Sequence, residues 1–182
     1  MSEHLEFIEV GRADEITVVA KLAGEIWGQH YTPLIGNAQV SYMIGKYQSA
    51  EAIGRQIASE GYSYYLMRDA AGSFVGYFAV VRKPSSGELF LSKLYVLLRH
   101  RGKGYARLAV DFIERIALRA GLEKISLTVN KRNESAISAY LKMGFENAGS
   151  VVADIGGGFV MDDYRMEKLV ARAGNGAPKR SG

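Results

Sequence analysis

The chain has 182 residues, no cysteine and a formal net charge of +4. This length fits one domain with a substantial core, and the lack of cysteine excludes disulfides, thiolate metal sites and a cysteine nucleophile. The modest charge suits an anionic cofactor, whereas a nucleic-acid binder would show a denser basic stripe, so we expect no nucleic-acid partner.

The N-terminus lacks the basic-then-apolar pattern of a signal peptide. No apolar run approaches the roughly 20 residues that span a bilayer. We therefore expect a cytoplasmic protein without a membrane partner.

The first third of the chain reads as a strand followed by helices. The strand is expected at Leu5–Val10, and Asp14 is expected to cap a helix whose apolar face reaches Trp27. Residues 28–36, which contain Pro33, are predicted to be a loop. Two helices are predicted after it, over 37–47 and 49–60.

From Tyr62 the apolar period changes to that of strands. Residues 62–68, 74–81 and 88–96 are predicted to be three antiparallel strands joined by glycine-bearing turns. A helix over 103–120 has near-ideal 3.6-residue spacing of apolar residues, and Gly121 stands at its C-terminal cap.

The remaining elements are a strand through Ile125 and Val129, a short helix over 133–144, and a hairpin of residues 145–154 and 159–168. This order predicts a single α/β sandwich with a mixed sheet. Residues 1–170 form the predicted domain, and the small, basic residues 171–182 form a flexible tail.

A basic, glycine-bearing turn joins the third strand of the meander to the long helix. A helix N-terminus with nearby glycines is a phosphate site, because its first N–H groups lack internal partners. The P-loop pattern fails, since Gly102-Lys103-Gly104 is followed by Tyr105. The dinucleotide pattern fails at Arg107, which stands at its third glycine. A plain connecting turn stays open as the alternative.

Two segments together resemble the GNAT superfamily of N-acetyltransferases. Arg101-Gly102-Lys103-Gly104-Tyr105-Ala106 is similar to its Arg/Gln-x-x-Gly-x-Gly/Ala signature, and residues 133–145 resemble its Asn-x-x-Ala-x-x-x-Tyr-x-x-x-Gly-Phe segment. The resemblance implies a mostly antiparallel, twisted sheet of about seven strands flanked by about four to five helices. The two helices after the first loop also resemble the spermidine/spermine acetyltransferase branch.

The resemblance implies acetyl-CoA as cosubstrate and no metal. The residues expected to bind acetyl-CoA are Leu94, Tyr95, Val96, Arg101, Gly102, Lys103, Gly104, Tyr105, Ala106, Asn133 and Lys142. Three of these have a simpler alternative. Lys103 could be a solvated residue at the rim of the site, Lys142 could be an ordinary surface lysine, and Asn133 could serve only as a helix cap.

The resemblance implies that Tyr140 is catalytic and gives a proton to the departing thiolate. The alternative is a core tyrosine that packs on Phe145. The general base stays open, because Ser92 and Lys93 stand on the strand where many relatives place a glutamate. The candidates are Glu25, His30, Asp154, Asp162, Asp163 and a water chain.

Trp27, Tyr31 and Asp162 are expected to bind the acceptor, since an aromatic and acidic pocket suits a cationic amine. We therefore expect an N-acetyltransferase acting on a primary amine such as a polyamine, by direct attack in a ternary complex. A protein N-terminus is the alternative acceptor. A non-catalytic acyl-CoA-binding regulatory module is the alternative function, and a homodimer is left open.

Overall fold

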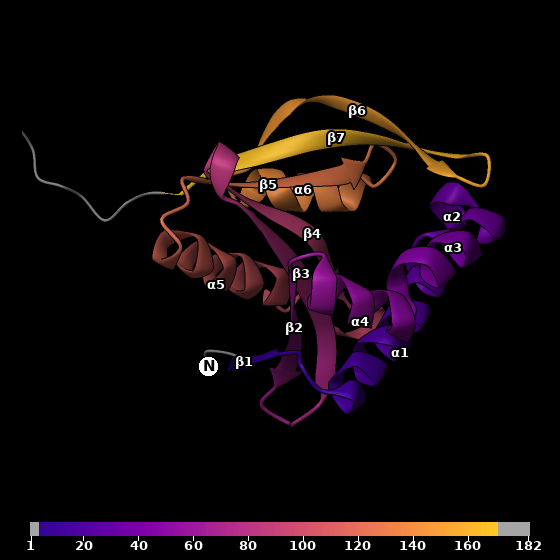
Figure 1. The fold of residues 1–182 in the computed structure, drawn as a ribbon, viewed down its shortest axis with the longest axis horizontal. Coiled ribbons are helices and arrows are strands. Elements are labelled where there is room, and N and C mark those ends of the chain that lie inside the picture. Colours follow the sequence, from indigo (N-terminus) through magenta and orange to yellow (C-terminus); the bar gives the residue numbers. More distant parts are fainter. Residues whose placement is uncertain (1–3, 171–182) are drawn as a thin grey trace, which may run out of the picture.

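The computed structural model describes residues 4–170, which form one mixed sheet between two layers of helices (Figure 1). The predicted tail, 171–182, lies outside the described residues. The strands are β1 (Leu5–Glu9), β2 (Tyr62–Asp69), β3 (Phe74–Lys83), β4 (Glu88–Val96), β5 (Lys124–Asn130), β6 (Glu146–Gly156) and β7 (Phe159–Leu169). The α-helices are α1 (Ala13–His30), α2 (Thr32–Ile35), α3 (Asn37–Met43), α4 (Ala50–Ser59), α5 (Tyr105–Arg119) and α6 (Glu134–Lys142).

The sheet has the order β1-β2-β3-β4-β5-β7-β6. Every neighbouring pair is antiparallel except β4 and β5, which are parallel and are connected through α5. The predicted α/β class with a mostly antiparallel seven-stranded sheet is confirmed. Among the described residues, the one α-helix beyond the predicted five is the single turn α2.

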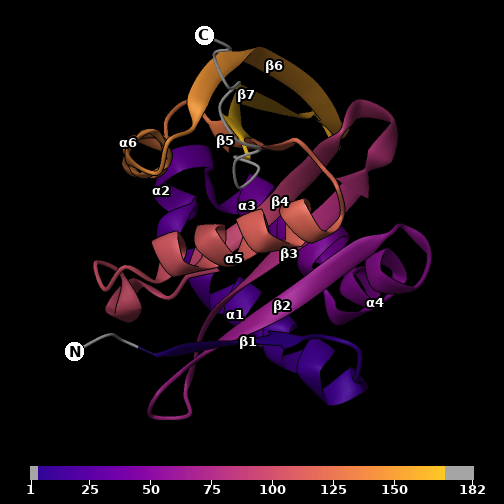
Figure 2. The same cartoon turned by 90° about the vertical axis from the view of Figure 1, so that its left-hand side faces the viewer.

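Two apolar clusters fill the space between the sheet and its helices. One packs α5 and α6 against one face, with Ile113, Phe78 and Leu127 among its buried members. The other packs α1, α3 and α4 against the opposite face, with Trp27, Tyr64 and Leu97 among its members. Figure 2 shows α5 in front of the sheet and α1 and α4 behind it.

Residues 28–36 are largely helical rather than a loop. Helix α1 continues through Gly28 to His30, and Pro33 stands in the first turn of α2. Proline is tolerated there because the first N–H groups of a helix have no intrahelical acceptor. The helix predicted over 37–47 is α-helical to Met43 and then forms a π-helical turn, Ile44–Gln48.

The start of α1 also differs from the expectation. Asp14 lies inside the helix, and Arg12 is the N-cap residue. The carboxylate of Glu15 accepts hydrogen bonds of 2.9 Å from the backbone N–H groups of Gly11 and Arg12. A carboxylate three residues into the helix therefore satisfies the donors before it.

Candidate active site

The site is centred on a gap between the parallel strands β4 and β5. These strands pair over three positions, Glu88 with Lys124, Leu89 with Ile125 and Phe90 with Ser126. Beyond Phe90 both strands continue, to Val96 and to Asn130, without further pairs. The backbone of Leu94 to Val96 therefore borders a gap on the side of β5.

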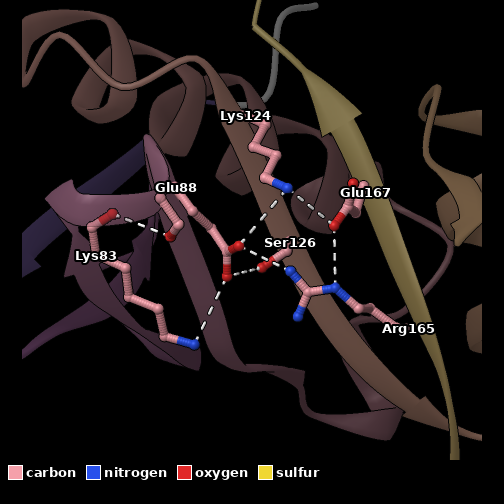
Figure 3. Close-up of polar contacts among 7 residues, drawn as sticks. Lys83, Glu88, Lys124, Ser126, Arg165 and Glu167 are labelled. Atoms are coloured by element: carbon pink, nitrogen blue, oxygen red, sulfur yellow. Dashed lines mark hydrogen bonds and ion pairs between the residues drawn. The ribbon is translucent and has the colours of Figure 1, made fainter. Parts of the chain in front are cut away.

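A cluster of polar side chains joins the strands at the end of the gap where β4 and β5 are paired (Figure 3). Glu88, which is 3% exposed, accepts hydrogen bonds from Ser126 on β5 and from Arg165 on β7. Burial alone would raise the pKa of Glu88, but Ser126 and Arg165 together with Lys83 lower it overall. The three strands are thus joined where the gap begins.

Strand β4 carries one extra residue beside the gap. Leu91 is opposite Val80 and Lys93 is opposite Ala79, so Ser92 forms a β-bulge. Leu91 and Val80 belong to the cluster under α5, whereas Ala79 belongs to the cluster under α1 and α4. In a regular strand Leu91 and Lys93 would share a face, and the bulge places them on opposite faces.

The glycine turn leads from β4 into α5 as predicted. Gly102 and Gly104 have φ of +78° and +79°, a conformation that favours glycine, and Gly104 is the N-cap of α5. No side chain caps this helix start. Its backbone N–H groups and the helix dipole therefore form a surface suited to phosphate.

Arg101 connects the turn to both sides of the gap. Its Nε donates to the carbonyl of Val96 at 3.1 Å, and its Nη1 lies 3.1 Å from Nδ1 of His30. The guanidinium can only donate, so Nδ1 of His30 accepts and Nε2 donates to Oδ1 of Asn133 at 3.3 Å. Burial and then Arg101 lower the pKa of His30, in keeping with a neutral ring.

One cavity of about 670 Å³ runs along this gap and joins the glycine turn to the face covered by α1 and α4. Of the residues predicted to bind acetyl-CoA, those lining it are Leu94, Tyr95, Val96, Arg101, Gly102, Gly104, Tyr105, Ala106 and Asn133. Lys103 and Lys142 are exposed and do not line it. Asn133 also caps α6 by accepting from the N–H of Ala136 at 3.3 Å.

An aromatic wall lines the cavity on the side of α1. Trp27 stacks on Tyr31 with ring centroids 4.4 Å apart, and both contact Tyr95 on β4, at 5.6 and 6.0 Å. Burial raises the pKa of Tyr31 to about 12, so this phenol stays protonated at neutral pH. The predicted acceptor residues Trp27 and Tyr31 therefore share one apolar surface with the predicted cofactor residue Tyr95.

Tyr140 lines the same cavity from α6. It is half-buried, and its ring packs edge-on against Phe145 with centroids 5.4 Å apart. Burial, with a smaller contribution from Tyr31, raises the pKa of Tyr140 above its ordinary value. The packing role and the cavity-facing role, which the sequence posed as alternatives, occur together in this residue.

Two adjacent aspartates of β7 have opposite environments. Asp162 has a side chain that is 58% exposed, forms an ion pair of 2.5 Å with Lys131, and does not line the cavity. Asp163 is 6% exposed and lines it. Successive side chains of a strand point to opposite faces, and this places Asp163, rather than the predicted Asp162, at the site.

Asp163 is the strongest basic candidate among the described residues. Its Oδ1 is buried without a hydrogen-bond partner in the described part of the chain. Burial raises its pKa to about 6, while the Thr128 side chain opposes this shift. Of the other candidates, Glu25 is ion-paired with Arg99, and Asp154 is exposed and accepts from the N–H of Gly156.

Lys93 is a cavity residue that the sequence did not assign to the site. It is 6% exposed and its Nζ donates to Oε1 of Gln56 at 2.9 Å. The available signal was a lysine inside an apolar strand. Its direction could not be derived, because that depends on the bulge.

Within residues 4–170, no group of three or more histidine, aspartate or glutamate side chains is placed to hold a metal ion. None of the helices described in this range is both long and apolar enough to cross a membrane.

Comparison with known proteins gives one family model and several relatives. The model described as the acetyltransferase (GNAT) family matches residues 13–145. The chain is 33% identical over 95 residues to N-acetyltransferase family 8 member 2 of Rattus norvegicus, covering 50% of this chain and 42% of the relative. It is 28% identical over 138 residues to N-acetyltransferase 8 of the same organism, covering 74% of this chain and 57% of the relative. The chain thus spans about half the length of these curated relatives.

Two solved structures are similar in fold. The PaiA N-acetyltransferase of Thermoplasma acidophilum, in complex with coenzyme A, has a TM-score of 0.73 at 19% identity, covering 91% of this chain and 99% of that one. The spermidine/spermine N-acetyltransferase SpeG of Vibrio cholerae has a TM-score of 0.62 at 19% identity, covering 91% and 92%. At this identity the likeness extends to the fold alone.

Proposed function

Because this chain belongs to the acetyltransferase (GNAT) family, we propose that it transfers the acetyl group of acetyl-CoA to the nitrogen of a small primary amine. The observation that carries the proposal is the single cavity along the β4–β5 gap. It brings the glycine turn, the edge of β4 that lacks pairs with β5, Tyr140 and Asp163 onto one surface.

The glycine turn is the proposed pyrophosphate site. Gly102 and Gly104 bring the backbone close to an anion without a Cβ in the way, and the N-terminus of α5 adds favourable dipole charge. The edge of Leu94 to Val96 that faces β5 without pairing to it is the proposed partner of the pantetheine arm. To expose the Val96 carbonyl, Arg101 would turn its Nε away.

Acetyl-CoA supplies an activated thioester, and two residues of the chain would transfer the protons. Asp163 would hold the acceptor ammonium and take one proton, which frees the nitrogen lone pair for attack on the carbonyl carbon. Once the carbon–nitrogen bond has formed, the nitrogen still carries one proton more than the amide product. As the carbon–sulfur bond breaks, Tyr140 would donate its proton to the thiolate, and the proton lost by the nitrogen would restore the phenol. The raised pKa of Tyr140 keeps that proton in place until then.

The acceptor is proposed only as a primary amine. Spermidine is one hypothesis, motivated by the aromatic wall and by the fold shared with SpeG. Among the described residues that line the cavity, Asp163 carries the one carboxylate. A cavity with one carboxylate suits a single ammonium group better than several.

The test is an acetyl-CoA turnover assay over a panel of amines and peptides, read by thiol release and by mass spectrometry of the acetylated product. The chain contains no cysteine, so the thiol signal comes from coenzyme A alone. Acetylated amine with matching thiol is the expected result. Acetyl-CoA binding without any acetylated product would favour a regulatory binding module, and acetylation confined to peptides would favour a protein N-terminus.

A further inference from the structure

A buried lysine stands in the cavity at a distance from the glycine turn. The bulge at Ser92 turns Lys93 toward α4 and β2. Its Nζ reaches Gln56 at 2.9 Å and lies over the rings of Tyr62 and Tyr64, at 4.7 and 5.0 Å from their centroids. These partners lie on the side of β4 away from β5, so the ammonium group marks the far part of the cavity.

This ammonium group has polar and aromatic neighbours but no ion pair in the described part of the chain. The carboxylate that acts on it from a distance is Glu60, which is exposed and accepts a 2.9 Å hydrogen bond from Arg55. Gln56 Oε1 is shared, since it also accepts from the hydroxyl of Tyr64 at 2.5 Å. A buried charge without a counter-ion is costly, and a bound anion would remove much of that cost.

The cavity therefore has opposite charges on its two sides. Asp163 lies on β7 beyond the gap, and Lys93 lies on β4 before it. Both side chains are 6% exposed, and both line the cavity. A ligand with a cation at one end and an anion at the other would complement both side chains.

We propose that the acceptor is a primary amine that also carries one carboxylate, with Asp163 receiving the amine and Lys93 binding the carboxylate. This inference rests on the proposed function and names the substrate class of the same site. The aromatic wall of Trp27, Tyr31 and Tyr95, with Tyr47 and Tyr62, indicates an apolar or aromatic body between the two groups. A single lysine among aromatic rings suits one negative charge better than a phosphate dianion.

The protonation of Lys93 is consistent with this role. Burial lowers the pKa of Lys93 to about 7, and the distant Glu60 opposes the shift only weakly. An anion bound beside Nζ favours the charged form. Binding of a carboxylate near pH 8 should therefore be accompanied by proton uptake, which a decarboxylated ligand would not cause.

The experiment compares matched amines that differ only in the carboxylate. The pairs are 4-(2-aminoethyl)benzoate with phenethylamine, 4-(aminomethyl)benzoate with benzylamine and 6-aminohexanoate with pentylamine, and spermidine is added. Each is assayed for kcat/KM and, with coenzyme A present, for binding by calorimetry. Lys93→Met removes the charge at similar volume, and Lys21→Met on the exposed face of α1 is the matched control.

For at least one pair, wild type should prefer the carboxylate member by about tenfold or more, a size expected for a charge-assisted contact. Lys93→Met should remove that preference, change the decarboxylated member by less than about threefold and keep coenzyme A affinity. Lys21→Met should behave as wild type.

Equal values within every pair, or a preference for spermidine that Lys93→Met leaves intact, would overturn the inference while acetyl transfer stands. An equal loss for both members in Lys93→Met would also overturn it, since it indicates a structural role. Selective binding of the carboxylate members without any turnover would instead support the anion site and contradict the proposed function.

Discussion

Nη2 of Arg165 on β7 donates a hydrogen bond of 2.7 Å to Oε2 of Glu88 on β4, across the intervening strand β5. The hydroxyl of Ser126 on β5 donates to the same carboxylate. Three strands thus share one buried anion at the end where the gap closes. The backbone ladder between β4 and β5 stops after Phe90, so these side chains reinforce a short junction.

Replacing Glu88 by Gln should lower the free energy of unfolding by about 3 kcal/mol at pH 7, because Arg165 and Lys83 lose their buried counter-ion. The pKa of Glu88 is lowered in the folded protein, so its stabilisation is present above the ordinary value of 4.5. It is lost as the pH falls below that value. Urea denaturation of wild type and variant should show the difference shrinking below pH 4.5, with exposed Glu146→Gln as control.

Replacing Gly104 by Ala should weaken coenzyme A binding roughly tenfold, because a side chain at φ +79° costs about 1–2 kcal/mol and shifts the start of α5. Gly72→Ala, at φ +83° in the β2–β3 turn, carries similar strain far from the site. Calorimetric titration with coenzyme A should separate the two. Equal affinity in both variants would remove the turn from the binding site.

Replacing Tyr140 by Phe should lower kcat about 100-fold, in the range of general acid catalysis, while acetyl-CoA affinity changes less than about twofold. The phenyl ring keeps its packing on Phe145 and loses only the proton. Stopped thiol-release assays at saturating amine give kcat. Tyr65→Phe, which packs under α5 on Phe78 and Phe112, is the control, and an unchanged kcat in Tyr140→Phe would exclude the residue from proton transfer.

The kcat/KM of wild type should rise with pH through about 6, since Asp163 must lose its proton before it can accept one. Asp163→Asn should lose that inflection and lower kcat/KM about 100-fold at pH 7.5. Asp162→Asn, next in the strand but exposed, should keep both the inflection and the rate. An inflection near 6 that persists in Asp163→Asn would assign the base elsewhere.

Lys93→Met should raise the free energy of unfolding above that of wild type, and this difference should be largest at acidic and neutral pH. The folded-state pKa of Lys93, about 7, lies below its ordinary value of 10.5, so the unfolded chain binds more protons between these values. Wild-type stability therefore rises with pH across this interval relative to the variant. Denaturation from pH 6 to 10 should show the difference falling, and a constant difference would contradict the burial of a titrating amine.

Periodicity was sufficient to predict the strands and the longer helices, because each element has one buried face. It failed at residues 28–36, where glycine and proline suggested a loop. There, the packing of Trp27 and Tyr31 against Tyr95 accompanies a helix that continues through Gly28. Local propensity is a weak guide where tertiary contacts are this extensive.

The motifs predicted which backbone segments border the cavity, because these follow from the order of strand, turn and helix. The charged side chains of the site could not be derived in the same way. Choosing between Asp162 and Asp163 requires the phase of β7, and a hairpin's register is not visible in its composition. The face to which Lys93 points could be predicted only with knowledge of the bulge.

The extra residue in β4 also has an evolutionary consequence. Leu91 and Lys93 point to opposite faces because Ser92 is extra, so loss of Ser92 would make them successive residues of a regular strand and keep each on its present face. A related chain with a β4 one residue shorter would therefore carry the counterpart of Lys93 directly after the counterpart of Leu91. Alignments of such chains need a gap at Ser92, because without it residues from opposite faces of the sheet would be compared.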